Sequence, residues 1–103
     1  MSNRLEQLLK LVKIAGNDPL SHYGLALEYI NLQRWTDAVA AFDATLAINP
    51  QYSAAIYHKG RAQIAANLHD EARTTLTQGI EVAKKQGDWK TADEMRGLLE
   101  TIE

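Results

Sequence analysis

The feature that most constrains this chain is an internal repeat, in which the pattern of residues 37–46 returns at residues 71–80. Its clearest copy is the stretch WTDAVAAFDATLAINP, residues 35–50, which begins with a bulky aromatic residue and ends in Asn49-Pro50, a pair that stops helices. One fixed shift along the chain aligns this stretch with a second one of matching character. The aligned pairs are Asp37 with Glu71, Ala38 with Ala72, Phe42 with Leu76 and Leu46 with Ile80. We therefore expect two copies of one structural unit.

The same shift also holds upstream of this stretch. It aligns Tyr23 with Tyr57, Ala26 with Gly60 and Ile30 with Ile64. In both copies apolar residues recur at spacings of three and four, which places them on one helix face, and no segment alternates with period two. The connections between helices are short, so consecutive helices should be antiparallel neighbours. The sequence predicts an all-α fold of antiparallel helix hairpins.

Six helices are expected, with their ends marked by residues that cap or break helices. They run over about residues 2–15, 19–32, 36–48, 53–66, 71–86 and 89–102. Asp18, Asp70 and Asp88 are expected to cap three of the starts, because an aspartate side chain can accept a hydrogen bond from the free N–H groups there. Gly87 is the expected C-terminal cap of the long fifth helix.

The first and last helices each carry one apolar stripe. The stripe of the first helix is Leu5, Leu8, Leu9, Val12 and Ala15, and that of the last is Trp89, Ala92, Met95, Leu98, Leu99 and Ile102. Both stripes are expected to pack on a neighbouring helix, as caps that cover the ends of a repeat array. Lys10 and Lys13 on the polar side of the first helix leave attachment to a membrane surface as an alternative for that helix.

Composition argues against several classes of function. The 103 residues are 46% hydrophobic and 23% charged, which is typical of one folded domain. The net charge of −2 is spread along the chain, whereas a nucleic-acid surface needs a concentrated basic face. There is no cysteine for disulfides or thiolate metal sites. We expect no nucleic-acid partner.

The apolar residues are interrupted too often for a targeting or membrane segment. No apolar run approaches the roughly 20 residues that span a bilayer, and the N-terminal residues contain no signal-peptide core. We expect a cytoplasmic protein with no membrane partner.

Candidate catalytic and metal-binding residues match no known site pattern. His22, His58 and His69 lie on different helices or at helix starts, without the spaced partners that a metal site needs. The serines and threonines match no nucleophile motif, and there is no glycine-rich phosphate loop. We therefore expect no enzyme activity, no metal and no cofactor.

The repeat resembles the tetratricopeptide repeat (TPR) family, whose unit is two antiparallel helices in about 34 residues. The shift that aligns the two copies here has the same period. The family's pattern places Trp, Leu-Gly, Tyr, Ala, Phe and Pro at fixed offsets. The first copy matches it at Leu25, Tyr29, Ala38, Phe42 and Pro50, and has His22 and Ala26 in the Trp and Gly positions. The second copy keeps Gly60 and Ala72, and has Ile56, Lys59, Gln63, Leu76 and Lys84 in the Trp, Leu, Tyr, Phe and Pro positions.

The resemblance implies a single domain, residues 1–103, that forms a right-handed superhelix. Its parts are an N-terminal capping helix (1–17), repeat one (19–52), repeat two with an extended second helix (53–86) and a C-terminal capping helix (88–103). Lys59 and Gln63 stand where the family buries Leu and Tyr. Either the Lys59 stem lies over apolar neighbours with its amine in water, or this part of the repeat is less covered and faces a partner.

TPR proteins bind peptides or proteins on the concave face lined by the first helix of each repeat, and the resemblance implies the same here. The corresponding residues are Leu20, Tyr23, Gly24, Leu27 and Asn31 in the first copy and Ala54, Tyr57, His58, Arg61 and Ala65 in the second. Family members that clamp a terminal carboxylate carry Lys and Asn where this chain has Tyr23, Leu27 and His58. Arg61 could still hold a single carboxylate. We expect an adaptor or scaffold for a protein or peptide partner.

Two alternatives remain open. Tyr23 and Tyr57 could merely pack between neighbouring first helices, since tyrosine suits such a contact equally well. The exposed apolar groove could also close on a second copy of the chain, which would make the protein a homodimer.

Overall fold

The computed structural model describes residues 3–103, which form six α-helices and no strand. The helices are α1 (Asn3–Ile14), α2 (Pro19–Asn31), α3 (Trp35–Ile48), α4 (Ser53–Ala65), α5 (His69–Lys85) and α6 (Trp89–Glu100). The all-α fold and the six helices expected from the periodicity are confirmed. The expected start of the first helix at Ser2 lies outside the described residues.

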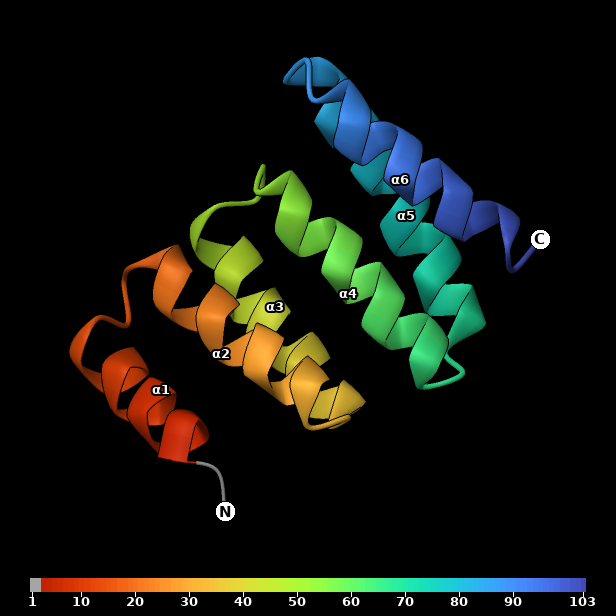
Figure 1. Ribbon diagram of the computed structural model, residues 1–103. Helices are drawn as coiled ribbons and strands as arrows, with labels where there is room; N and C mark the ends of the chain where they lie inside the picture. Colours follow the sequence, from red (N-terminus) through yellow and green to blue (C-terminus); the bar gives the residue numbers. More distant parts are fainter. Residues whose placement is uncertain (1–2) are drawn as a thin grey trace.

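Each helix packs against the next one in the chain, and α6 also contacts α4. Figure 1 shows α2, α4 and α6 on one side of the molecule, with α3 and α5 behind them and α1 beside α2 at one end. We call the side formed by α2, α4 and α6 the first-helix face, because α2 and α4 are the first helices of the two hairpins. The stacking of the hairpins therefore brings α2 and α4 to the same side of the molecule, although they are separated in sequence by α3.

The turns inside the two hairpins repeat in their backbone geometry. Gln33 and Asn67 are one repeat apart, and both have positive φ, at 58° and 63°. In both turns the next N–H donates to the carbonyl five residues earlier, at 2.8 Å. A left-handed residue with this hydrogen bond is the Schellman ending, which stops a helix and reverses the chain. The sequence repeat thus extends to a backbone conformation, which asparagine favours at position 67 and glutamine adopts at position 33.

Two of the three expected aspartate caps are confirmed. The Asp18 carboxylate accepts a hydrogen bond from the Leu20 N–H at 2.9 Å, and the Asp88 carboxylate accepts one from the Thr91 N–H at 3.2 Å. Gly87 follows the end of α5 with φ of 73°, the left-handed conformation that a C-terminal cap requires.

The expected cap at Asp70 is wrong. α5 begins at His69, two residues before the expected start, with Leu68 in the cap position and no side-chain cap hydrogen bond. Asp70 lies inside the first turn, where its carboxylate pairs with Arg73. Because the turn at Asn67 already reverses the chain, the helix starts before Asp70 is reached.

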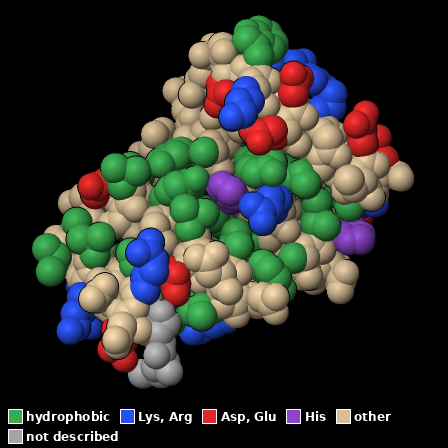
Figure 2. Space-filling model, in the orientation of Figure 1, with side chains coloured by type: hydrophobic (Ala, Val, Ile, Leu, Met, Phe, Trp, Pro, Cys, Tyr) green, Lys and Arg blue, Asp and Glu red, His purple; other side chains and the backbone are tan. Residues whose placement is uncertain are grey.

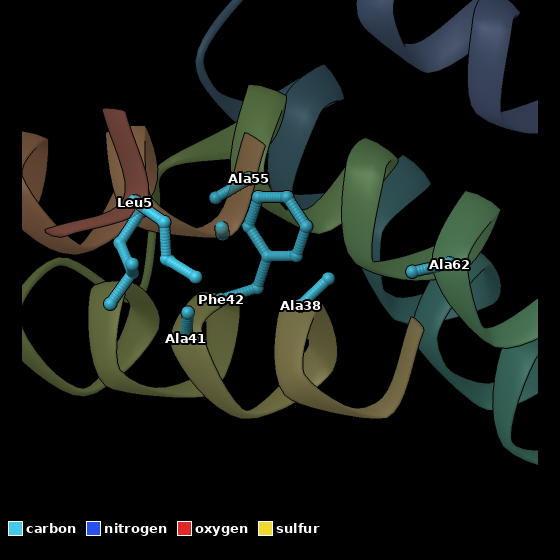
Figure 3. Packing of buried hydrophobic residues seen from close by; sticks show 8 residues of the cluster. Leu5, Ala38, Ala41, Phe42, Ala55 and Ala62 are labelled. Carbon is cyan, nitrogen blue, oxygen red and sulfur yellow. The ribbon is translucent and has the colours of Figure 1, made fainter. Parts of the chain in front are cut away.

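Phe42 lies at the centre of the first core. Its side chain is fully buried, and the core around it draws on α1, α2, α3 and α4. Figure 3 shows the ring rising from α3 toward Ala55 of α4, with Ala38 and Ala41 beside it on α3. The small alanine side chains let the helix backbones approach closely around one large ring.

The second core is built around Leu76, which occupies the position that Phe42 occupies in the first copy and is also fully buried. A Cβ atom on Gly60 would lie 2.5 Å from a Leu76 methyl carbon, so α4 and α5 meet where no side chain fits. A Cβ atom on Gly79 would lie 2.5 Å from Ile56 and 2.6 Å from the Met95 sulfur. The glycines at these two crossings therefore let α4 and α6 pack closely against α5.

The two capping stripes are only partly confirmed. In α1, Leu5 is buried and Leu8 and Val12 pack against the core, but Leu9 is exposed. In α6, Met95 is fully buried, whereas the Trp89 side chain is 60% exposed. Residues at the outer edge of a stripe stay exposed because the neighbouring helix covers only the middle of the stripe.

Among residues 3–103, no helix combines the length and apolar character needed to cross a bilayer.

Candidate functional site

The ten residues expected to line a groove come from α2 and α4, and they differ in exposure. Leu20, Asn31, Arg61 and Ala65 are exposed, and Tyr23, Gly24, Leu27, Ala54, Tyr57 and His58 are half-buried. Hydrophobic side chains gather across the middle of the first-helix face, with a histidine and a basic side chain among them (Figure 2). The exposed members lie toward the ends of α2 and α4, and the half-buried aromatic members lie between them.

Five aromatic side chains form one connected group, the aromatic cluster: Tyr23, Phe42, Tyr52, Tyr57 and His58. The Tyr23 ring stacks on Tyr52, with centroids 4.9 Å apart and an interplanar angle of 24°. The His58 ring lies parallel to Phe42 at 6.1 Å and meets Tyr57 edge-on at 5.0 Å. Tyr23 and His58 are themselves 6.1 Å apart, which joins α2 to α4. The cluster spans both copies of the repeat.

Tyr23 and Tyr57 both pack against a core and remain partly exposed on the first-helix face. Tyr23 packs against the first core and Tyr57 against the second, yet neither is fully covered. Burial, followed by the neighbouring Tyr52, raises the pKa of the Tyr23 hydroxyl. Each ring therefore supports the helix packing with one part and leaves the rest accessible on the first-helix face.

Arg61 is held beside the aromatic cluster by two contacts. Its Nη1 lies 3.2 Å from Nδ1 of His58, and its guanidinium lies over the Tyr57 ring, 6.0 Å from the centroid. Burial, followed by the charge of Arg61, lowers the pKa of His58. A neutral His58 with its proton on Nε2 accepts a hydrogen bond from Arg61 at Nδ1.

An ion pair between an exposed arginine and a buried glutamate lies at the α1 side of this face. The Nε of Arg4 on α1 is 3.2 Å from Oε1 of Glu28, whose side chain is buried on α2. The Asn31 amide donates to the same carboxylate oxygen at 3.5 Å. Asn31 therefore has a structural partner in addition to its expected place in the groove.

Neither expectation for Lys59 and Gln63 holds completely. The Lys59 stem is partly covered, but its amine pairs with Asp43 at 2.7 Å instead of lying free in water. Gln63 is buried at 5% exposure, so this part of the repeat is not less covered. Its Oε1 is buried and has no hydrogen-bond partner among the described residues. The amide fills a position that the family fills with a large side chain and leaves one polar atom unsatisfied.

A cavity of about 260 Å³ adjoins Arg61 near the C-terminal ends of α4 and α6. Its walls include Ile30, Trp35, Arg61, Ala65, Leu98 and Thr101. Of these, only Arg61 and Ala65 were expected at a binding site. A shift by one repeat does not point to Trp35, Leu98 or Thr101, because they lie at the start of α3 and at the C-terminal end of α6.

Residues 3–103 contain no group of three or more His, Asp or Glu side chains arranged to hold a metal ion. The Nε2 atom of His22 lies 2.9 Å from the Gly16 carbonyl, which fixes this ring at the turn between α1 and α2.

A family model described as a tetratricopeptide repeat matches residues 29–93, which is more than half of the chain. A tetratricopeptide repeat domain protein from Salinibacter ruber is 30% identical over 82% of this chain and 86% of its own, with a TM-score of 0.75. No curated protein matches the chain.

Two further solved structures share the fold at lower identity. The TPR2B domain of yeast Sti1 is 21% identical over 93% of this chain and 77% of its own, with a TM-score of 0.87. The second TPR domain of human RPAP3 is 17% identical over 91% of this chain and 77% of its own, with a TM-score of 0.76.

Proposed function

This chain belongs to the tetratricopeptide repeat family, and from that premise we propose that it binds a segment of a protein partner on its first-helix face. In this role it is a non-enzymatic adaptor or scaffold of the cytoplasm. Two of its structural neighbours were solved as complexes, Sti1 with pHsp70 and RPAP3 with the HSP70 peptide SGPTIEEVD. Those complexes support protein binding as the use of this fold.

The observation that carries the proposal is the aromatic cluster with Arg61 at its edge. Half-buried tyrosines and an arginine are the residue types that contribute most to protein interfaces. Tyr23 and Tyr57 are already positioned by their contacts with Phe42, Tyr52 and His58. Because these rings lose little further freedom on binding, their apolar surface can contribute to affinity at a small entropic cost.

The test begins with selection of peptides from a random display library against the immobilised protein. Affinities of the selected peptides are then measured for the wild type and for Tyr57→Ala. If Tyr57 is an interface hot spot, the substitution weakens binding by about 2 kcal/mol or more. Unchanged affinity for every selected peptide would move the binding site away from this face.

Tyr29→Ala is the matched control. Tyr29 is also a half-buried tyrosine, but it packs in the first core and has the guanidinium of Arg34 over its ring at 4.8 Å. Its loss should lower stability without changing peptide affinity.

Sedimentation equilibrium over a range of concentrations tests the alternative that the partner is a second copy of the chain. The alternative requires a dimer that dissociates in the Tyr57→Ala variant and that the selected peptides disrupt. Such a dimer would replace the proposed partner with a second copy.

A further inference from the structure

We propose that the cavity between α4 and α6 seats an apolar side chain of the partner, and that an Asp or Glu side chain of the same segment pairs with Arg61. The proposal rests on the function proposed above and deepens it, because it specifies the chemistry of the segment. Its basis is the juxtaposition of an apolar cavity with a cation that has no carboxylate partner among residues 3–103.

Arg61 is exceptional among the arginines of the described residues. The other four each pair with a carboxylate: Arg4 with Glu28, Arg34 with Asp37, Arg73 with Asp70 and Arg96 with Asp93. Arg61 has only the His58 ring nitrogen and the face of Tyr57. A guanidinium beside apolar surface offers a strong site for an anion, because it can donate two parallel hydrogen bonds to one carboxylate.

The size and walls of the cavity suit side chains of a peptide. Its volume of about 260 Å³ is below the roughly 300–1,000 Å³ of pockets that take drug-sized ligands. Aliphatic side chains and the Trp35 ring form most of the wall, and Arg61 supplies its only charge. An aliphatic side chain of the partner would therefore lose apolar surface to the cavity while a neighbouring carboxylate remained within reach of the guanidinium.

His58 and Tyr57 position the guanidinium for this role. The hydrogen bond to His58 uses one N–H group of Arg61 and leaves others for a ligand. His58 is packed between Phe42 and Tyr57, so it is a fixed support. Because part of the arginine is already ordered, less side-chain entropy is lost when a carboxylate binds.

A second cavity, of about 190 Å³, lies among α3, α4 and α5 and provides a comparison. Lys59 lines it, but the Lys59 amine is already paired with Asp43 at 2.7 Å. An acidic partner would have to displace that carboxylate. Of the two cavities, the one at Arg61 is therefore the better site for an acidic segment, because its positive charge is not already paired with a carboxylate of the described residues.

An acidic side chain fits this site better than the carboxylate at the end of a chain. A terminal carboxylate is typically captured by a nest of several donors. Here a single guanidinium supplies the charge, and one bidentate pair is what an Asp or Glu side chain requires.

The experiment titrates the isotope-labelled full chain with acetyl-Asp-Leu-amide and acetyl-Leu-Asp-amide and follows the indole N–H signals. Trp35 lines the cavity, whereas Trp89 lies at the opposite end of α6 with its side chain exposed, so it is an internal reference. We expect at least one probe to shift the Trp35 signal saturably and to leave the Trp89 signal in place. Replacement of Asp by Asn in the probe, or Arg61→Gln in the protein, should weaken binding about tenfold or more.

Two further variants separate the cavity from the charge. Ala65→Leu fills the cavity from an exposed position on α4 and should abolish the Trp35 shift while Arg61 remains. Ala40→Leu adds the same volume at an exposed position on α3 and should have no effect. If Ala65→Leu leaves probe binding unchanged, the cavity does not seat the leucine and the proposal is overturned.

The remaining outcomes distinguish this inference from the function on which it rests. If neither probe shifts Trp35 but the selected peptides still bind and still depend on Tyr57, this inference fails and the proposed function stands. If the selected peptides do not depend on Tyr57 either, both fail. Tighter binding of acetyl-Ala-Leu with a free terminal carboxylate than of both amidated probes would overturn the choice of an acidic side chain.

Discussion

Phe42 and Leu76 occupy equivalent positions in the two hairpins, and both are fully buried. The Phe42 ring is surrounded by alanines, among them Ala38, Ala41 and Ala55. Leu76 lies against Gly60, where no Cβ atom fits. Each large side chain is thus matched by small residues on the helices that it contacts.

Phe42→Ala should lower the free energy of unfolding by about 3–5 kcal/mol, because none of the surrounding alanines can fill the cavity. Phe42→Leu, which copies the residue of the second hairpin, should cost less. Chemical denaturation monitored by circular dichroism measures both. An unchanged midpoint for Phe42→Ala would show that the ring is not the centre of the first core.

His58 should make stability depend on pH. Its pKa is lowered from 6.5 in the folded chain, by burial first and then by Arg61, so the unfolded chain takes up a proton at a higher pH than the folded chain does. The contribution of His58 to the free energy of unfolding is fully present above pH 6.5 and is lost as the pH falls toward the folded-state pKa. Between about pH 7.5 and 5, the free energy of unfolding should decrease by at most about 1.4 kcal/mol per pH unit from this one proton.

The measurement compares urea denaturation at several pH values for the wild type, His58→Gln and His69→Gln. The first substitution should flatten the decrease, and the second, at an exposed residue, should preserve it. Asp88 adds a separate loss at lower pH, because hydrogen bonds from Ser53 and then Thr91 hold its pKa below 3.8. An equal slope for wild type and His58→Gln would show that His58 is not kept neutral by its surroundings.

At the scale of the helix, α6 and its flanking residues are joined to the second hairpin by one packing contact and two hydrogen bonds. Met95 is fully buried and lies against Gly79 of α5. The Ser53 hydroxyl donates to the Asp88 carboxylate at 2.7 Å, and Arg73 donates to the Ile102 carbonyl at 3.0 Å. These contacts indicate that α6 is part of the fold.

Deletion of residues 88–103 should therefore yield a partly unfolded or aggregating chain, because it exposes the second core to water. Circular dichroism and light scattering measure the two effects. A monomeric truncated chain with unchanged thermal stability would instead show that α6 is detachable.

The helices illustrate where sequence reasoning succeeds and where it stops. Periodicity and the residues Asp18, Asp88 and Gly87 predicted their number and most of their ends, because those signals are local. The cap predicted at Asp70 was wrong because the preceding turn already fixes the start of α5. The exposure of Trp89 depends on how far a neighbouring helix extends, which no local pattern contains.

At the scale of the whole molecule, the same limit applies to the binding face. A shift by one repeat carried the site residues from α2 to α4, and the structure joins Tyr23 to His58. The alignment of the two copies did not indicate Tyr52, because Asp18 stands at the equivalent position of the first copy. The alignment also did not indicate that Trp35 lines a cavity, because this cavity forms only when both hairpins and α6 are stacked.

Binding of a protein segment to the first-helix face can be mapped directly by recording which backbone amide signals of the isotope-labelled chain shift when a selected peptide is added. We predict that the shifts concentrate on α2, α4 and the C-terminal half of α6, with Tyr23, Tyr57 and Arg61 among the largest. Shifts confined to α3 and α5, which lie behind this face in Figure 1, would contradict it.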